Sequence, residues 1–240
     1  MPCSFIGAYP PHPAVAGSTI TIILHRAGPS IPRTSDGGLA IDHPLALPPG
    51  FRALAGEDDP WEAALRTAAL GAATGSLYWN EVQGLYRAAI VFAPDHPLGR
   101  TSLAMGPDLL NLGAVALFDA LAVLAPPQVP MHLLLPDSLA VDGGRVATLR
   151  LAQAPSLDDA ASHWAVLGID VSVDLQAAAP GNTPDRTCLA AEGFGEVTAA
   201  ELMAHVCRHL LCWADTWRED GGRALAQAVS LRTLRAPAAA

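Results

Sequence analysis

The feature that most constrains the fold is a set of neighbouring strand patterns joined by turns too short for a helical crossover. Residues 138–141 (SLAV) and 145–151 (RVATLRL) are separated only by the turn sequence D-G-G. Residues 76–80 (SLYWN) and 86–93 (YRAAIVFA) are separated by a short polar segment with one glycine. Parallel neighbours need a crossover of about a dozen residues or more, so both pairs are predicted to be antiparallel hairpins.

Helical patterns surround these hairpins. Asp59-Pro60 has the N-cap and first-turn residues of a helix that runs to Gly71, and T-A-A-E at 198–201 is a capping box that begins a helix ending at Gly221. A third helix is predicted at 107–125, a central strand at 131–135 and a further strand at 164–175. Hairpins mixed with helices predict an α+β fold (an α/β sandwich), with a mixed, largely antiparallel central sheet packed by helices.

Composition excludes several functional classes. The chain has 240 residues, of which 51% are hydrophobic and 15% charged, and this excludes a disordered or fibrous protein. The formal net charge is −9, so we expect neither a nucleic-acid partner nor a membrane partner. All 14 basic residues are arginine. Chemistry that depends on a lysine amine, such as a Schiff base or a phosphate-loop lysine, is therefore excluded.

The chain divides into three predicted parts. Residues 1–47 are rich in proline and glycine and are predicted to form an arm or linker, with one strand at 19–25. Residues 48–232 carry the regular patterns and form the predicted domain, and 233–240 form a tail. The four cysteines form no C-x-x-C pair, and neither a charged signal region nor an apolar run long enough for a membrane span is found. We therefore expect a cytoplasmic protein.

The last predicted helix carries residues with metal-ligand spacing. Four potential ligands follow one strip of this helix: Glu201, His205, His209 and Cys212. An H-x-x-x-H pair followed by cysteine is a spacing found in metal sites, but a half-exposed helix flank has the same spacing. We favour the helix flank because the sequence contains no second ligand cluster, and no metal site is predicted.

Two cysteines deserve separate predictions. Cys188 follows Thr187, which resembles a helix N-cap, and a thiol in the first turn of a helix can have a lowered pKa. Cys188 is therefore a candidate nucleophile, although a structural role is the simpler interpretation. Cys207 lies off the predicted apolar face of the last helix, and no function is predicted for this cysteine.

Several segments together resemble one known family. The run L-L-L-P-D-S-L-A-V-D-G-G-R-V-A-T-L-R-L-A resembles the W-P-N-D … G-x-K-x-x-G-I-L region of biotin and lipoate protein ligases. W-A-V-L-G-I-D-V-S-V-D-L at 164–175 resembles the G-I-G-I-N-V-N strand of that family, and 185–217 resembles its T-S-L … E-L segment. The resemblance covers about residues 48–232 and is closest to the bacterial W-P-D subgroup. It implies the fold of the ligase catalytic domain.

The resemblance also implies site residues. Pro136 matches the proline of the family motif, Asp137 takes the place of its asparagine, and Asp137 can equally serve the P-D-S turn. Arg145 stands where the family has its lysine, and Thr148 where it has a glycine. Arg145 would hold the ligand carboxylate, with Pro136, Asp137, Gly144 and Thr148 lining the cleft. The glycine- and arginine-rich loop of the family is replaced by the short connection at 81–84.

These matches and departures imply three functions. The first is a divergent biotin/lipoate ligase-like protein that retains a cleft for biotin, lipoate or octanoate without efficient ligation. The second is an active ligase or acyltransferase of altered mechanism, for which ATP and an acceptor carrier protein are implied by the resemblance. The third is a structural, partner-binding pseudoenzyme. Arginine is planar and bulkier than lysine, so this exchange at a reactive centre is not conservative.

Overall fold

The protein is built around one twisted sheet, seen in a computed structural model that describes residues 46–56, 58–154, 163–174, 185–195 and 197–233. These residues belong to one compact unit that spans 40–240. The predicted strand at 19–25 lies outside the described residues, as do nearly all of the predicted arm and tail.

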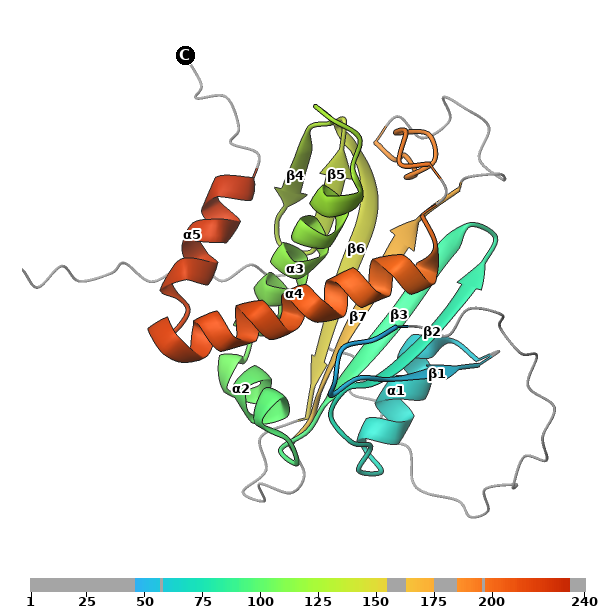
Figure 1. The fold of residues 1–240 in the computed structure, drawn as a ribbon. Coiled ribbons are helices and arrows are strands. Elements are labelled where there is room, and N and C mark those ends of the chain that lie inside the picture. The colour runs from blue at the N-terminus through green and yellow to red at the C-terminus, as the bar shows by residue number, and fades with distance from the viewer. Residues whose placement is uncertain (1–45, 57, 155–162, 175–184, 196, 234–240) are drawn as a thin grey trace, which may run out of the picture. The chain divides into compact units, whose positions relative to one another are not determined.

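The described sheet has seven strands in the order β1-β2-β3-β7-β6-β5-β4. The strands are β1 (Arg52–Ala55), β2 (Ser76–Val82), β3 (Leu85–Phe92), β4 (Met131–Leu134), β5 (Ser138–Val141), β6 (Gly144–Gln153) and β7 (Ala165–Ser172). The helices are α1 (Pro60–Ala68), α2 (Pro97–Met105), α3 (Asp108–Leu124), α4 (Ala199–Asp220) and α5 (Arg223–Arg232). Only β1 and β2 are parallel, and the other neighbouring pairs are antiparallel. The predicted mixed, largely antiparallel α+β fold is confirmed (Figure 1).

Turn chemistry explains both hairpins. Gln83 and Gly84, between β2 and β3, have φ angles of 52° and 72°, and Asp142 and Gly143, between β5 and β6, have 45° and 83°. Two successive positive φ angles are the signature of the tight turns that match strand twist, and each turn has a glycine at its second position. Both predicted hairpins are therefore confirmed.

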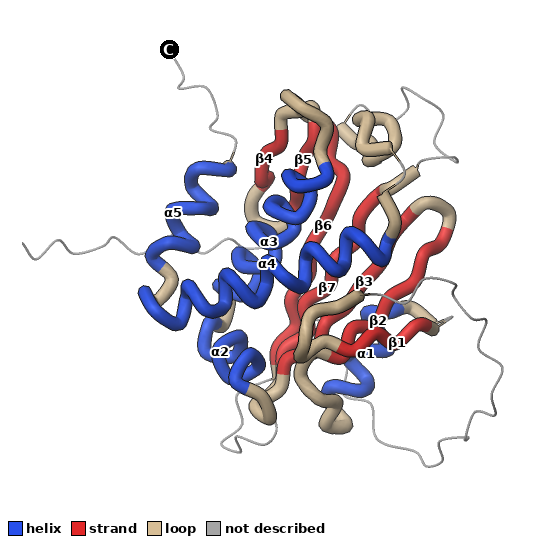
Figure 2. Tube along the Cα trace, in the orientation of Figure 1, coloured by secondary structure: helices blue, strands red, loops and turns tan. Residues whose placement is uncertain are grey.

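The two faces of the sheet pack against different helices (Figures 1 and 2). Alternate residues of a strand point to opposite faces. On one face, strand residues join the main core cluster with residues of α3 and α4, as shown on β3 by Tyr86, Ala88, Ile90 and Phe92. On the other face, strand residues join a smaller cluster with α1: Ala89, Val91 and Val166 pack with Ala64 and Ala68. Because α1 contacts β2, β3 and β7, the second face is covered by this helix at those strands.

Some elements differ from the sequence predictions. The strand at 131–135 is not central: β4 lies at the edge of the sheet. Its run of apolar residues is explained by burial of one side only, since Leu133 is buried while its neighbours are partly exposed. Strand β1 and helices α2 and α5 were not predicted, because each is short and only weakly patterned in the sequence.

Helix α4 begins and ends as its sequence predicts, but its buried face is wider than the predicted apolar face. Thr198 Oγ1 accepts a hydrogen bond from the Glu201 N–H at 3.1 Å, and Gly221 ends the helix with a φ of 69°. The prediction for Cys207 was wrong, because this residue is completely buried in the main core. Burial raises the pKa of its thiol to about 12.

Helix α5 is attached to α3 and α4 by a partly buried charge. Arg232 forms an ion pair with Asp119 of α3 at 2.8 Å, and the second oxygen of Asp119 accepts from Trp213 Nε1 at 2.9 Å. The Arg232 guanidinium also lies over the rings of Phe118 and Trp213, at 5.3 and 5.8 Å from their centroids. This one arginine therefore joins three helices.

Among the described residues, no single helix is long and apolar enough to cross a membrane. Helices α2 and α3 pass that test as a pair on length and composition, but they are bent by 113° relative to each other. Most of the residues of α3 are buried within the main core.

Replacing Arg232 tests the attachment of α5. We expect Arg232→Ala to lower the free energy of unfolding by about 1–3 kcal/mol, since it removes a charged hydrogen bond and leaves Asp119 with a single partner. Urea denaturation measures this change. Arg223→Ala, at the exposed start of the same helix, is the matched control and should change stability by less than about 0.5 kcal/mol. Equal effects of the two variants would contradict the attachment.

Candidate functional site

A row of polar side chains crosses the sheet on the face that α1 partly covers. Its members are direct cross-strand partners in sequence: Asn80 with Arg87, Arg87 with Asp170, Asp170 with Thr148, and Thr148 with Ser138. Direct partners on neighbouring strands project from the same face. These five residues, here called the polar row, therefore form one line across β2, β3, β7, β6 and β5.

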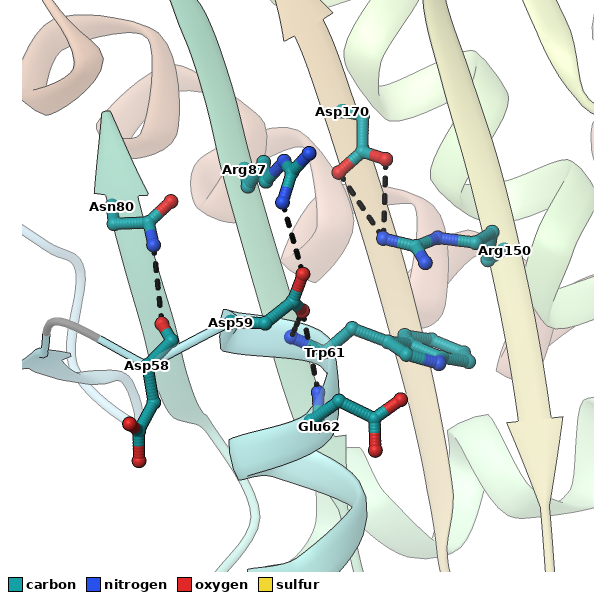
Figure 3. Close-up of polar contacts among 8 residues, drawn as sticks. All are labelled: Asp58, Asp59, Trp61, Glu62, Asn80, Arg87, Arg150 and Asp170. Atoms are coloured by element: carbon teal, nitrogen blue, oxygen red, sulfur yellow. Dashed lines mark hydrogen bonds and ion pairs between the residues drawn. The ribbon is translucent and has the colours of Figure 1, made fainter. Parts of the chain in front are cut away.

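The N-terminus of α1 is joined to the polar row through Asp59. One oxygen of Asp59 caps the helix by accepting from the N–H of Trp61 at 2.9 Å and of Glu62 at 3.4 Å. The other oxygen forms an ion pair with Arg87 at 3.0 Å (Figure 3). Nearby, the Asn80 amide donates to the backbone carbonyl of Asp58 at 3.1 Å. Asp59 therefore serves both the helix and the sheet.

A second ion pair lies on the same face. Arg150 Nη2 contacts both oxygens of Asp170, at 3.3 and 3.1 Å. The Arg150 guanidinium also lies over the Trp61 ring, 4.7 Å from its centroid, so the two groups are stacked (Figure 3). Trp61 in turn lies against Gly168, where a Cβ atom would come within 2.7 Å of the ring. Helix α1 is thus fitted to the sheet around a position without a side chain.

Burial gives this face unusual electrostatics. Burial raises the pKa of Asp170 above its ordinary value, although the neighbouring Arg150 and Arg87 act in the opposite direction. The Nε–H groups of Arg87, Arg145 and Arg150 are buried and have no hydrogen-bond partner among the described residues. A buried donor without a partner is costly, and binding sites are one place where such groups occur.

Arg145, the residue predicted to hold a carboxylate, lies on the same face. It pairs across the sheet with Ala140, beside a β-bulge, and Ala140 alternates with Leu139 and Val141 of the main core. The Arg145 side chain is 35% exposed and contacts the carboxylate of Asp185, which is 70% exposed, at 3.3 Å. Arg145 thus lies on the same face beyond the polar row, toward the start of β6.

The segment at 185–187 runs beside the start of β6. The Arg145 N–H donates to the Asp185 carbonyl at 2.9 Å, and the Thr187 N–H donates to the Arg145 carbonyl at 3.1 Å. Gly144 lies under this segment, because a Cβ atom there would come within 2.7 Å of Thr187 Cγ2. The structure therefore brings Gly144 and Arg145 against residues that follow them by about forty positions in the sequence.

The other predicted site residues lie at the opposite end of the β5–β6 pair. Thr148 is a member of the polar row, next to Ser138. Pro136 and Asp137 are exposed in the turn between β4 and β5, and Asp137 Oδ1 accepts from the Ser138 hydroxyl at 2.8 Å. The Asp137 carbonyl also accepts from the Leu149 N–H at 2.7 Å. This turn is thereby held against β6.

The alternative sites considered from the sequence are not supported. Within the described ranges, no group of three or more histidine, cysteine or acidic residues is placed to hold a metal ion. Burial and the nearby Arg208 lower the pKa of His205. The prediction that Thr187 caps a helix was wrong, since Thr187 precedes a turn and donates to the Glu192 carboxylate at 2.5 Å. Cys188 is therefore a buried turn residue rather than the first-turn thiol of a helix.

A surface hollow of about 400 Å³ lies elsewhere, between β1, α1 and β2. Its lining includes Leu54, Pro60, Ala63, Thr67, Tyr78 and the exposed Arg66–Asp58 ion pair. None of the predicted site residues lines this hollow. We place the candidate site on the polar face instead, because the chemistry of its side chains converges there.

The family model described as the biotin/lipoate A/B protein ligase family matches residues 47–230. The chain belongs to this family. The chain is similar, with 31% identity and a TM-score of 0.66, to a biotin protein ligase-like protein of unknown function from Silicibacter sp. TM1040, covering 81% of this chain and 85% of that one. Biotin protein ligase from Aquifex aeolicus is similar in fold, with 15% identity, a TM-score of 0.60 and coverage of 77% and 78%. No curated protein sequence matches the chain.

A further structure of the Aquifex aeolicus ligase is described as a complex with biotin and ATP. It matches this chain with 14% identity, a TM-score of 0.55 and coverage of 76% and 78%. The predicted ligase catalytic-domain fold is thus confirmed. At this level of identity the likeness concerns the fold alone.

One departure from the ligase pattern is found in the structure as well as in the sequence. Where the family has its glycine- and arginine-rich loop, β2 and β3 are joined by the Gln83-Gly84 turn. The Gly84 carbonyl accepts from the N–H groups of Val173 and Asp174, at 2.7 and 3.1 Å. This turn contains no arginine, and its carbonyl is fixed to the end of β7.

Several residues of this face were not predicted as functional. Asp59 was assigned only a capping role, while Trp61, Arg87, Arg150 and Asp170 were treated as parts of a helix and strands. A signal was available, because single charged residues such as Arg87 and Asp170 interrupt otherwise apolar strands. This signal alone could not reveal the polar row, because that requires the pairing register of strands that are distant in the sequence.

The titration of Asp170 provides a test of the polar row. Because the pKa of Asp170 is higher in the folded state, its contribution to stability is fully present below the unfolded pKa of about 3.9 and is lost as the pH rises through the folded-state pKa. Asp170→Asn removes this dependence. The difference in free energy of unfolding should therefore shift in favour of the variant as the pH rises from below about 3.9 through the folded-state pKa of Asp170.

Chemical denaturation at a series of pH values measures this difference. Asp215→Asn is the matched control, because Asp215 is 68% exposed on α4 and forms only a surface ion pair with Arg218. A difference between wild type and Asp170→Asn that does not change with pH would contradict the raised pKa of Asp170.

Proposed function

We propose that this protein binds a small carboxylic acid on the polar face, with Arg145 holding the carboxylate. The observation that carries the proposal is the position of Arg145, a partly exposed guanidinium on the same face of the sheet as the polar row. The sequence resemblance, which aligns Arg145 with the family lysine, supports it. Family membership supports a ligand of the biotin, lipoate or octanoate class.

The present partner of Arg145 can be replaced by a ligand. The contact to Asp185 is single and 3.3 Å long, and the Asp185 side chain is 70% exposed. Exposed pairs of this kind contribute about 0–1 kcal/mol. A ligand carboxylate can instead form two parallel hydrogen bonds with the guanidinium, an arrangement that is stronger and more specific. The buried Nε–H of Arg145 is a further donor without a partner among the described residues.

The remaining predicted residues have supporting places in this proposal. The Thr148 hydroxyl stands in the polar row and can donate to or accept from the body of a ligand. Pro136 and Asp137 form the turn at one end of the β5–β6 pair, and Gly144 lies at the other end. They would bound the ligand along the hairpin.

We further propose that binding is not followed by efficient activation with ATP. Joining a carboxylate to a phosphate brings two anions together, and cationic groups and backbone donors must stabilise the developing charge. In this chain the family lysine is an arginine that already faces Asp185, and the family loop is a turn fixed to β7. The second candidate, an active ligase of altered mechanism acting on a carrier protein, makes the opposite prediction.

The proposed location is a reducing cytoplasm. Cys188, Cys207 and Cys212, the cysteines in the described ranges, are free thiols, and two of them are buried. This arrangement supports the expectation from the sequence.

Binding measurements test the proposal directly. Biotin, lipoate and octanoate are each titrated into the full chain by calorimetry. We expect at least one to bind, and Arg145→Ala to weaken that binding about 10–100-fold, as for loss of a charged hydrogen bond. Arg186→Ala removes an exposed guanidinium from the adjacent segment and should leave affinity within about twofold. If no acid binds, or if both variants bind alike, the proposal is wrong.

The same preparations distinguish the two candidate functions. ATP–pyrophosphate exchange is measured with each acid that binds, followed by transfer to a carrier protein. Binding without exchange supports the proposed function. Exchange that depends on the acid supports the active ligase and overturns the claim that activation is lost.

A further inference from the structure

The hollow between β1, α1 and β2 lies apart from the polar row and has a chemistry of its own. Its volume is about 400 Å³, the room of roughly a dozen water molecules. It lies beside α1 at the edge of the sheet, since α1 packs against β2, β3 and β7 and β1 is the edge strand beyond them. None of the residues predicted to hold an acid lines it.

The surface of the two strands in this hollow is apolar. Leu54 and Tyr78 are direct partners across β1 and β2, and Tyr78 packs with residues of α1, so both project from the face that α1 covers. On the helix side the hollow is lined by Pro60 and by the buried Ala63, whose small side chain leaves space above the strands. The Thr67 hydroxyl is already engaged, because it donates to two backbone carbonyls of its own helix at 2.8 and 3.1 Å.

The charged groups that line the hollow, among the described residues, are Arg66 and Asp58. Arg66 Nη2 contacts Asp58 Oδ2 at 3.2 Å, and the two side chains are 59% and 75% exposed. A single exposed contact of this kind contributes little to stability. The backbone of Asp58 is held by the Asn80 amide at 3.1 Å, while its carboxylate points away from Arg87 (Figure 3). The fold therefore places both charges at the hollow, and a ligand can replace the contact between them.

We infer that this hollow binds a free α-amino acid with an apolar side chain. An ion of one sign would take one member of the Arg66–Asp58 pair and leave the other without its partner. A zwitterion offers a carboxylate to Arg66, which can bind it through two parallel hydrogen bonds, and an ammonium group to Asp58. Its apolar side chain then covers Leu54 and the Tyr78 ring and removes them from water.

The size of the hollow sets the size of the ligand. A volume of about 400 Å³ is near the lower end of the range for small-molecule sites, which suits a single amino acid rather than a peptide or a nucleotide. The inference does not depend on the proposed acid site, since the two sites have no lining residue in common.

Leucine and three related compounds test the ligand class. Glycine lacks the apolar side chain, leucinamide lacks the carboxylate, and N-acetylleucine lacks the ammonium group. Calorimetry on the full chain measures each affinity. We expect leucine to bind at least about tenfold more tightly than glycine, through burial of its side chain. We expect it to bind at least about fivefold more tightly than either derivative, because each derivative leaves one charge of the pair without a partner.

Filling the hollow tests its location. Ala63→Leu extends a side chain from α1 into the space and keeps a residue that favours helix. We expect this variant to bind leucine at least about tenfold more weakly than the wild type does. Ala226→Leu is the matched control, because it makes the same change at an exposed position of α5, and it should leave the affinity within about twofold.

Removing one charge tests the role of the pair. We expect Arg66→Gln to weaken leucine binding at least about fivefold and not to weaken leucinamide binding, since leucinamide has no carboxylate for Arg66 to hold. A purely structural effect would weaken both ligands alike. Arg218→Gln is the matched control, because Arg218 forms a similar exposed pair with Asp215, at 3.1 Å and with side chains 60% and 68% exposed. Arg66→Gln is also the second variant should Ala63→Leu fail to fold.

The outcomes separate this inference from the proposed function. We expect Arg145→Ala to bind leucine as the wild type does. If leucine binding is lost in Arg145→Ala and kept in Ala63→Leu, leucine binds as an acid on the polar face, which overturns this inference and leaves the proposed function standing. The inference is also overturned if leucine does not bind, if glycine binds as tightly as leucine, or if Arg66→Gln weakens leucine and leucinamide equally.

Discussion

The Asp59 carboxylate is the contact on which the arrangement of the polar face depends. One of its oxygens accepts a hydrogen bond from a free N–H group in the first turn of α1, and the other forms an ion pair with Arg87 on the sheet. This sharing fixes both the start of the helix and its distance from β3. It places Trp61 over Gly168, and Trp61 supports the guanidinium of Arg150. A side chain that appears in the sequence as an ordinary N-cap therefore organises a network that reaches three strands away.

The network is tolerable because its charges are balanced and only partly buried. Arg87 and Arg150 are each matched by a carboxylate, and the side chains of these pairs retain between 21% and 41% of their exposure. Fully buried ion pairs often cost more in desolvation than they return, but water still reaches these groups. The opposite face of the same strands has no such desolvation cost, since its residues are the apolar residues of the main core. The sheet therefore separates an apolar face that packs into the main core from a polar face that is partly exposed.

Short sequence motifs predicted the local structure well. They did not predict the pairing register of strands that are distant in the sequence. The D-G-G turn, the Asp59 cap and the Gly221 end are short-range chemistry, and the structure has all three. The edge position of β4 depends on which strands meet, and an apolar run of four residues contains no such information. The prediction for Cys207 was wrong because packing against α3 and the rest of the main core buries more of α4 than its apolar pattern indicates. The polar row combines five strands, so it appears only when their registers are known.

The absence of lysine takes on a definite meaning in this setting. At most surface positions arginine replaces lysine without consequence, but the sequence resemblance aligns Arg145 with the lysine of the family motif. A guanidinium is suited to grip a carboxylate with two parallel bonds, and less suited to place a compact charge between carboxylate and phosphate. The turn at Gln83-Gly84 acts in the same direction, since its carbonyl is bound to β7 and provides no movable cover. In the proposed function both departures act in the same direction, because each favours holding an acid over activating it with ATP.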